Sequence, residues 1–206
     1  MNHFSKFALR AALAVSSALL LAASASAAVL TTKISVDNSY TAYLATADNL
    51  TGTQFASGTD WGVPTNGSIT LGSAAQYFLH IDALDAGGVA GMIGQFSLTG
   101  SGYHFANGLT SLATGSSFIT GNATGFTGSY GAVTAYGTNG VSPWNYQPAY
   151  AADSQWIWVG NNDTNNRSFF TVAILADAPA SVPEPSSLAL AALGLLALGR
   201  MRAKKQ

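Results

Sequence analysis

The stretch Gln76-Tyr77-Phe78-Leu79-His80-Ile81-Asp82 has the alternation of a half-buried β-strand, and this pattern decides the fold. Successive residues of a strand point to opposite faces of a sheet, so Tyr77, Leu79 and Ile81 are expected in the core. The opposite face receives Gln76, Phe78, His80 and Asp82. Around this stretch, Gly, Ser, Thr and Asn recur roughly every 8 to 12 residues, which indicates short antiparallel strands.

Other segments extend this pattern along the chain. The apolar run Phe169–Leu175 indicates a central strand covered on both faces. Gly91 and Gly94 indicate a bulge or a close approach of the backbone. Residues 99–150 are expected to form short strands and loops. Because no β-α-β pattern is present, the sequence predicts an all-β domain over residues 28–181, an antiparallel β-sandwich of jelly-roll type. The expected strands are Leu30–Val36, Tyr40–Ala45, Gly67–Leu71, Gln76–Leu84, Val89–Leu98, Gln155–Val159 and Ser168–Leu175.

Charge is scarce, with 8% of the 206 residues charged against about 25% in an average soluble domain. The absence of cysteine excludes a disulfide scaffold, a thiol enzyme and a cysteine-ligated metal site. Between residues 28 and 181 the basic residues are Lys33 and Arg167, against eight Asp and no Glu. So few cations cannot neutralise a phosphate backbone, and nucleic-acid binding is therefore excluded.

The N-terminus has the pattern of a secretory signal peptide over residues 1–27. Lys6 and Arg10 precede the apolar run Ala11–Ala23, and Ala25-Ser26-Ala27 forms an A-x-A cleavage pattern. The alternative, a membrane-anchoring helix, is disfavoured because the apolar run is short. The sequence therefore predicts export across the inner membrane, with cleavage after Ala27 or Ala28.

The C-terminus, residues 182–206, combines three elements. Pro183, Glu184 and Pro185 lie in a stiff hinge, and the run Leu188–Gly199 that follows is almost wholly Leu, Ala and Gly. A basic cluster then ends the chain. An apolar helix followed by basic residues stops in a membrane with the basic end cytoplasmic. We expect a short hydrophobic transmembrane helix that serves as a temporary anchor. The basic residues are Arg200, Arg202, Lys204 and Lys205.

This tripeptide, the short helix and the basic end together resemble the PEP-CTERM sorting signal of Gram-negative bacteria. The resemblance implies that an exosortase recognises Pro183-Glu184-Pro185, removes the tail and passes the protein to the cell surface or extracellular matrix. It also implies an association with exopolysaccharide production. The expected partners are thus the secretion machinery, the exosortase, the inner membrane transiently, and an exopolysaccharide.

The body itself resembles, loosely, the galactose-binding-like jelly-roll modules of bacterial extracellular proteins. The resemblance lies in a display strand, a tryptophan turn, and a buried strand that ends in an Asp-Gly-Gly type of loop. It implies a fold more than an activity, although many such modules bind glycans or calcium. The matching segments are Asp37–Leu44, Gly58–Trp61, Ile69–Leu71, Tyr77–Asp82 and Asp85–Gly88.

Enzymatic motifs are missing from the body. The sequence has no G-x-S-x-G, H-E-x-x-H, P-loop or G-x-G-x-x-G motif. His80 and His104 are the residues able to act as unperturbed bases near neutral pH. A Ser–His–Asp triad has no locating signal, and a carboxylate-pair glycosidase would need two Asp. The sequence therefore predicts a protein that is not an enzyme and has no catalytic residue.

Aromatic residues are the candidates for glycan binding. Sugar rings stack on exposed aromatic faces while polar side chains bind their hydroxyls. Trp61 follows a turn, and Trp144 and Tyr146 lie in a loop stiffened by prolines. Trp156 and Trp158, two residues apart, are expected to share a strand face and to fill the core.

The sequence predicts no cofactor, with the exception that a calcium ion stays open. The loop Asn161–Asn166 is dense in oxygen ligands but lacks the spacing of an EF-hand. The calcium candidates are Asp60, Asp82, Asp85 and Asp163.

Together these patterns predict a secreted, non-enzymatic β-sandwich of the cell surface or biofilm matrix, with glycan binding as one role. Two alternatives stay open at this point. One is a purely structural or adhesive matrix component, and the other is an Asp-dependent glycan hydrolase.

Overall fold

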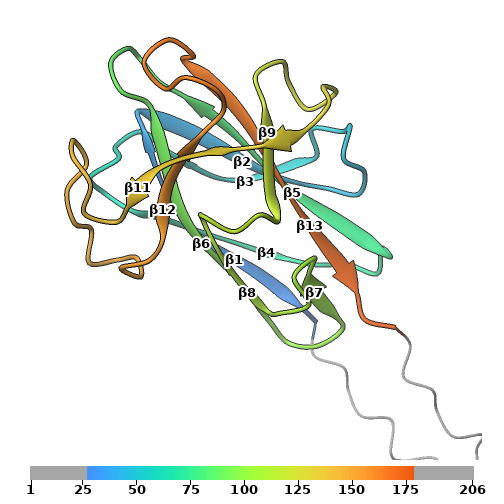
Figure 1. Cartoon of the computed structure of the whole chain (residues 1–206). Coiled ribbons are helices and arrows are strands. Elements are labelled where there is room, and N and C mark those ends of the chain that lie inside the picture. Colours follow the sequence, from blue (N-terminus) through green and yellow to red (C-terminus); the bar gives the residue numbers. More distant parts are fainter. Residues whose placement is uncertain (1–26, 179–206) are drawn as a thin grey trace, which may run out of the picture. The chain divides into compact units, whose positions relative to one another are not determined.

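The computed structural model describes residues 27–178, which form thirteen β-strands in two antiparallel sheets packed as a sandwich (Figure 1). Sheet A has the order β11-β12-β6-β1-β4, with β8 also paired to β6. Its strands are β1 (Val29–Asp37), β4 (Thr65–Thr70), β6 (Gly91–Thr99), β8 (Ser111–Ala113), β11 (Thr134–Thr138) and β12 (Gln155–Trp158).

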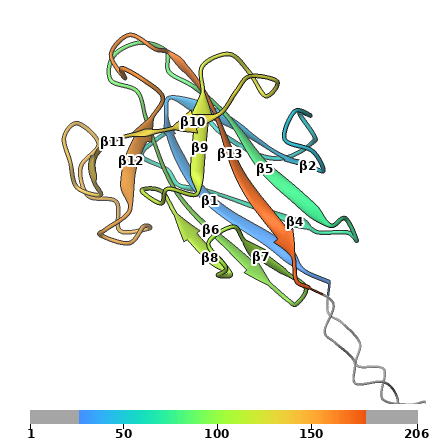
Figure 2. The same ribbon diagram turned by 45° about the vertical axis from the view of Figure 1, so that its right-hand side comes forward.

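Sheet B has the order β10-β9-β13-β5-β2-β3, with β7 also paired to β13. Figure 2 shows β13 and β5 running side by side in this layer. Its strands are β2 (Ser39–Ala45), β3 (Thr53–Gly58), β5 (Gln76–Leu84), β7 (Tyr103–Phe105), β9 (Ile119–Asn122), β10 (Gly131–Ala132) and β13 (Arg167–Ala176).

The predicted all-β sandwich is confirmed, and its jelly-roll likeness stays a prediction. The β5 strand has the bounds expected from the sequence, and the other expected strands differ from the observed ones by a few residues at their ends. The strand β3 was not expected, because its side chains are exposed or half-buried and carry no apolar alternation.

The core lies between the two sheets. Tyr77, Leu79 and Ile81 of β5 are buried in it, as predicted from their alternation. The β13 strand is central in sheet B, where Phe170 lies between Ile81 of β5 and Gly121 of β9. The expected central position of Phe169–Leu175 is therefore confirmed. Both faces are buried from Ser168 to Val172, whereas Ala173 and Leu175 are half-buried.

The chain divides into a compact unit that ends at Ala176 and a second unit, Asp177–Gln206, of which residues 177 and 178 are described. The predicted signal helix and hydrophobic tail helix lie outside the described residues. Within residues 27–178, no helix is long and apolar enough to cross a membrane.

Candidate functional site

A groove of about 840 Å³ lies on the outer face of sheet A, the face turned away from sheet B. Leu30 and Ile34 of β1 point into the core, so Thr31 and Lys33 between them point outward. The same alternation on β6 turns Gln95 outward. The groove is thus the outward face of the middle of this sheet.

Strand register sets the polar side chains of the groove in rows across the sheet. Lys33 lies opposite Asn66 of β4 on one side and Gln95 of β6 on the other. The neighbouring row brings Thr31 opposite Ser97 of β6, with Ser111 of β8 next to Ser97. Because directly opposite residues share a face, these side chains form a continuous polar floor.

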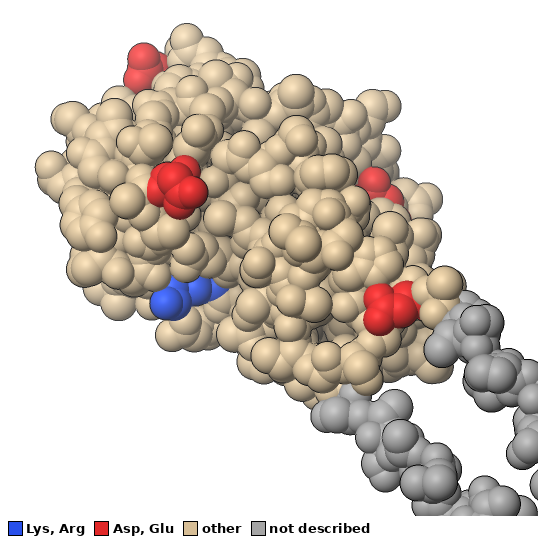
Figure 3. Space-filling model, turned by 60° about the horizontal axis from the view of Figure 1, so that its bottom comes forward, with Lys and Arg blue, Asp and Glu red and all other residues tan. Residues whose placement is uncertain are grey.

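The groove carries little charge. Among the residues that line it, Lys33 and Asp153 are the charged ones, and Lys33 Nζ donates a hydrogen bond to the Ala149 carbonyl at 3.2 Å. Figure 3 shows a face of the molecule on which the few charged side chains are separated by uncharged surface. The groove can therefore bind a ligand through hydrogen bonds more than through electrostatic attraction.

The three aromatic candidates do not line this groove. Trp144 is 2% exposed and stacks on Trp156, with ring centroids 4.5 Å apart, so it has no face free for a sugar. Its ring also lies over Gly91, where an added Cβ would be 2.5 Å from the indole. The close backbone approach expected at Gly91 is thus confirmed. Tyr146 is exposed. Trp61 is half-buried and packs against the apolar cluster that contains Trp144 and Trp156.

Trp156 and Trp158 are both fully buried, as the core interpretation predicted. The two indoles contact different clusters: Trp156 joins Trp144 in an outer cluster, while Trp158 packs edge-on against Phe170 in the main core. The shared strand face stays a prediction. The pairing of this strand with β11 contains an irregularity on the β11 side, where Tyr136 is the extra residue between the pairs Ala135–Ile157 and Gly137–Trp156. Such an irregularity increases the local twist of the two strands.

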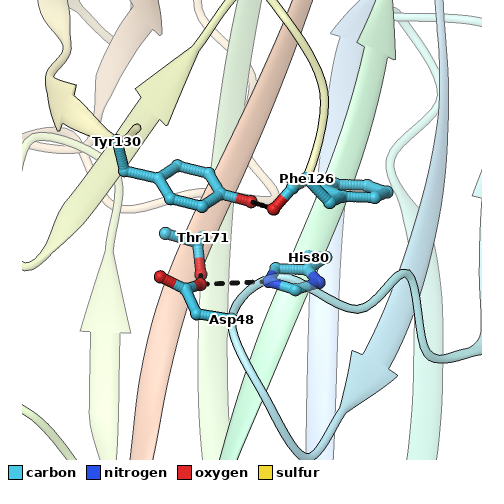
Figure 4. A network of polar contacts seen from close by, with 5 residues as sticks. All are labelled: Asp48, His80, Phe126, Tyr130 and Thr171. Carbon is cyan, nitrogen blue, oxygen red and sulfur yellow. Dashed lines mark hydrogen bonds and ion pairs between the residues drawn. The ribbon is translucent and has the colours of Figure 1, made fainter. Parts of the chain in front are cut away.

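A second polar cluster lies on the outer face of sheet B, around His80 of β5 (Figure 4). His80 Nε2 lies 3.2 Å from Asp48 Oδ1, and Thr171 Oγ1 of β13 donates to the same oxygen at 2.6 Å. The Phe126 ring stacks on the imidazole at 4.7 Å, and His80 is fully buried. Burial and the charge of Asp48 raise the pKa of the Tyr130 phenol beside it.

This cluster does not have the arrangement of a nucleophile and its base. The Thr171 hydroxyl donates to the Asp48 carboxylate, whereas a catalytic hydroxyl gives its proton to the imidazole. The contact of Asp48 with His80 and the burial of His80 were not predicted from the sequence, because the loops that cover this face are distant from β5 in the chain. Among the described residues the second histidine, His104, lies on β7 opposite Leu175.

The four calcium candidates have separate surroundings. Asp82 makes a two-point contact with the Arg167 guanidinium, at 2.9 and 2.8 Å. Asp60 and Asp163 are exposed, and Asp85 is buried. Within residues 27–178 no group of three or more His, Cys, Asp or Glu is placed to hold a metal ion.

Comparison with known proteins adds one finding. Residues 181–203 match the PEP-CTERM protein-sorting motif, which confirms the resemblance seen at Pro183, Glu184 and Pro185. No curated protein and no solved structure matches the chain. The motif implies processing by an exosortase and export to the cell surface.

Proposed function

Because the sorting motif implies a protein exported to the cell surface, we propose that the sandwich is a non-enzymatic surface or matrix module that binds a neutral polysaccharide in the groove of sheet A. The observation that carries this proposal is the polar floor of the groove. Asn66, Gln95 and Ser97 supply amide and hydroxyl groups, which are the donors and acceptors that pair with sugar hydroxyls.

The charge of the groove favours a neutral ligand. Lys33 and Asp153 oppose each other in sign, and Lys33 is already engaged with the Ala149 carbonyl. An anionic polysaccharide would need several free cations along its path. Since a typical hydrogen bond contributes only about 0.5–1.5 kcal/mol net and no tryptophan lines the floor, each site should bind weakly, and many copies on a surface would add avidity.

The groove favours binding over hydrolysis because a single carboxylate lies among its lining residues. Glycoside hydrolysis by the common mechanisms needs two carboxyl groups roughly 5–10 Å apart. Asp153 is the acidic residue among those that line the groove. The proposal is therefore recognition without bond cleavage.

The test is binding of the exported protein to a glycan array and to extracellular polysaccharide of the producing cell. Gln95→Ala should weaken binding roughly three- to tenfold, which corresponds to one lost hydrogen bond. Gln54→Ala removes the same side chain from the exposed edge strand of sheet B and should leave binding unchanged. Absence of any glycan binding by the unaltered protein would favour the purely structural alternative, and equal effects of the two variants would remove the groove as the site.

A further inference from the structure

The carboxylate of Asp85 is buried without any partner in the described part of the chain. Asp85 directly follows β5, is 3% exposed, and neither of its buried carboxylate oxygens has a hydrogen-bond partner. Buried charged groups in proteins are normally paired, hydrogen-bonded or bound to a metal ion. This side chain therefore points to a ligand that residues 27–178 do not supply.

A second acidic residue, Asp37, lies at the same end of the sandwich. The Asn38 N–H donates to the Leu84 carbonyl at 2.8 Å, and the Ala86 N–H donates to Asn38 Oδ1 at 2.6 Å, so Asn38 contacts the residues on both sides of Asp85. Asp37, the residue before Asn38, ends β1. These contacts hold the ends of β1 and β5 together and bring the two carboxylates to one end of the sandwich.

Asp37 is half-buried, and a hydrogen bond from Trp144 holds one of its oxygens. Burial raises the pKa of Asp37, the hydrogen bond from Trp144 lowers it, and the negative charge of Asp85 raises it again. Trp144 Nε1 donates to Asp37 Oδ2 at 2.9 Å. The other oxygen of Asp37 is left for a second partner.

The chain's own cations are used elsewhere. Lys33 and Arg167 are the basic residues between positions 28 and 178. Lys33 donates to the Ala149 carbonyl, and Arg167 makes its two-point contact with Asp82. Within the described residues, neither side chain is available to neutralise Asp37 and Asp85 together.

We infer that Asp85 and Asp37 bind one calcium ion at this end of the sandwich. Calcium takes six to eight oxygen ligands and accepts carboxylates together with backbone carbonyls and water. A site with two carboxylates and no nitrogen or sulfur donor favours this hard cation over zinc or copper. Two carboxylates alone imply modest affinity, on the order of 10⁻⁴–10⁻³ M, as in extracellular modules. Through Trp144, the ion also connects the β1 end to the loop that covers sheet A.

Trp144 makes the site measurable with terbium, which replaces calcium and emits when a nearby indole is excited. The full exported protein, stripped with a chelator, should show sensitised Tb³⁺ emission that Ca²⁺ displaces. Adding Ca²⁺ alone at about 10 mM, above the expected dissociation constant, should raise its melting temperature by several degrees. Magnesium should do less, because it retains its water and demands a stricter geometry.

Variants distinguish this site from other acidic residues. Asp85→Asn and Asp37→Asn should each lose most of the Tb³⁺ emission and of the Ca²⁺-dependent melting shift, and the shift within each variant is compared so that a change in basal stability does not matter. Asp163→Asn, at an exposed carboxylate, should keep both signals. The inference is overturned by an unaltered protein that shows neither signal, by an equal response to Mg²⁺, or by Asp163→Asn losing as much as Asp85→Asn.

Discussion

The outer faces of the two sheets are each covered by loops, but with different chemistry. On sheet A, the loop of residues 139–154 closes over an apolar cluster formed by Ile93, Trp144, Tyr150 and Trp156. On sheet B, Phe126 and Tyr130 cover His80, which contacts a half-exposed carboxylate (Figure 4). The groove is the part of the sheet A face that stays uncovered. Loops therefore decide which outward side chains become a third layer and which form a binding surface.

The largest difference between the two faces should appear in stability. Trp144→Ala should lower the free energy of unfolding by about 3–5 kcal/mol, because it empties a buried site beneath the loop. Phe126→Ala should cost about 1–2 kcal/mol, since that ring is half-buried and its edge and stacking contacts contribute modestly. Urea unfolding of both variants measures the comparison.

Tyr146→Ala is the control for the first variant, because it removes a neighbouring aromatic ring that is 60% exposed. Its effect should stay within about 0.5 kcal/mol. If Phe126→Ala proves as costly as Trp144→Ala, the cover of sheet B is as tightly packed as that of sheet A, and the contrast between the faces fails.

Much of the fold was predictable from the sequence because it depends on local alternation. The pattern of Tyr77, Leu79 and Ile81 specifies which face of β5 is buried, and the run Phe169–Leu175 specifies a central strand. These properties come from a period of two residues and from hydrophobic burial. The β3 strand escaped prediction because an exposed edge strand needs no such period.

The outer faces of the sheets, including the candidate groove, were less predictable, because they depend on contacts between distant segments. Trp144 has the sequence environment of an exposed loop residue, yet its indole bonds to Asp37, 107 positions away. His80 alternates outward from β5 and is nevertheless buried beneath Phe126. Alternation says which side chains leave the core and cannot say what covers them. The polar rows of the groove become visible only once strand order and register are known.

A smaller effect on stability is expected at alkaline pH, from a buried tyrosine on the sheet A face. Tyr150 donates to Ser35 Oγ at 3.0 Å beneath the sheet A loop, and burial is the main cause that raises its pKa. A phenol with a raised folded pKa contributes stability that is complete below its unfolded pKa of about 10 and is lost as the pH rises through the folded value. Tyr150→Phe should therefore lower the free energy of unfolding by about 1 kcal/mol at neutral pH, because a hydrogen bond is lost. Above about pH 10 the difference between the variant and the unaltered protein should be smaller.

Unfolding in urea at about pH 7 and about pH 11 tests this expectation. Tyr146→Phe, which alters an exposed ring, is the control variant measured in parallel. A constant cost of Tyr150→Phe across this range would mean that ionisation of this phenol does not contribute to alkaline unfolding. The loop over sheet A would then be less closed than its contacts indicate.

The smallest effect is expected at the ion pair on the outer face of sheet B. Arg167 is 56% exposed in its side chain, contacts both oxygens of Asp82, and lies 4.9 Å above the Phe169 ring. Arg167→Lys keeps the charge but loses the planar two-point geometry, so we expect a cost of about 0.2–1 kcal/mol that shrinks at high salt. Urea unfolding at low and high salt, with Asp82→Asn as the partner variant, measures it. A salt-independent cost near that of Phe126→Ala would place this pair inside the aromatic cover of sheet B, and the two faces would then differ in how they bury charge as well as in how they pack rings.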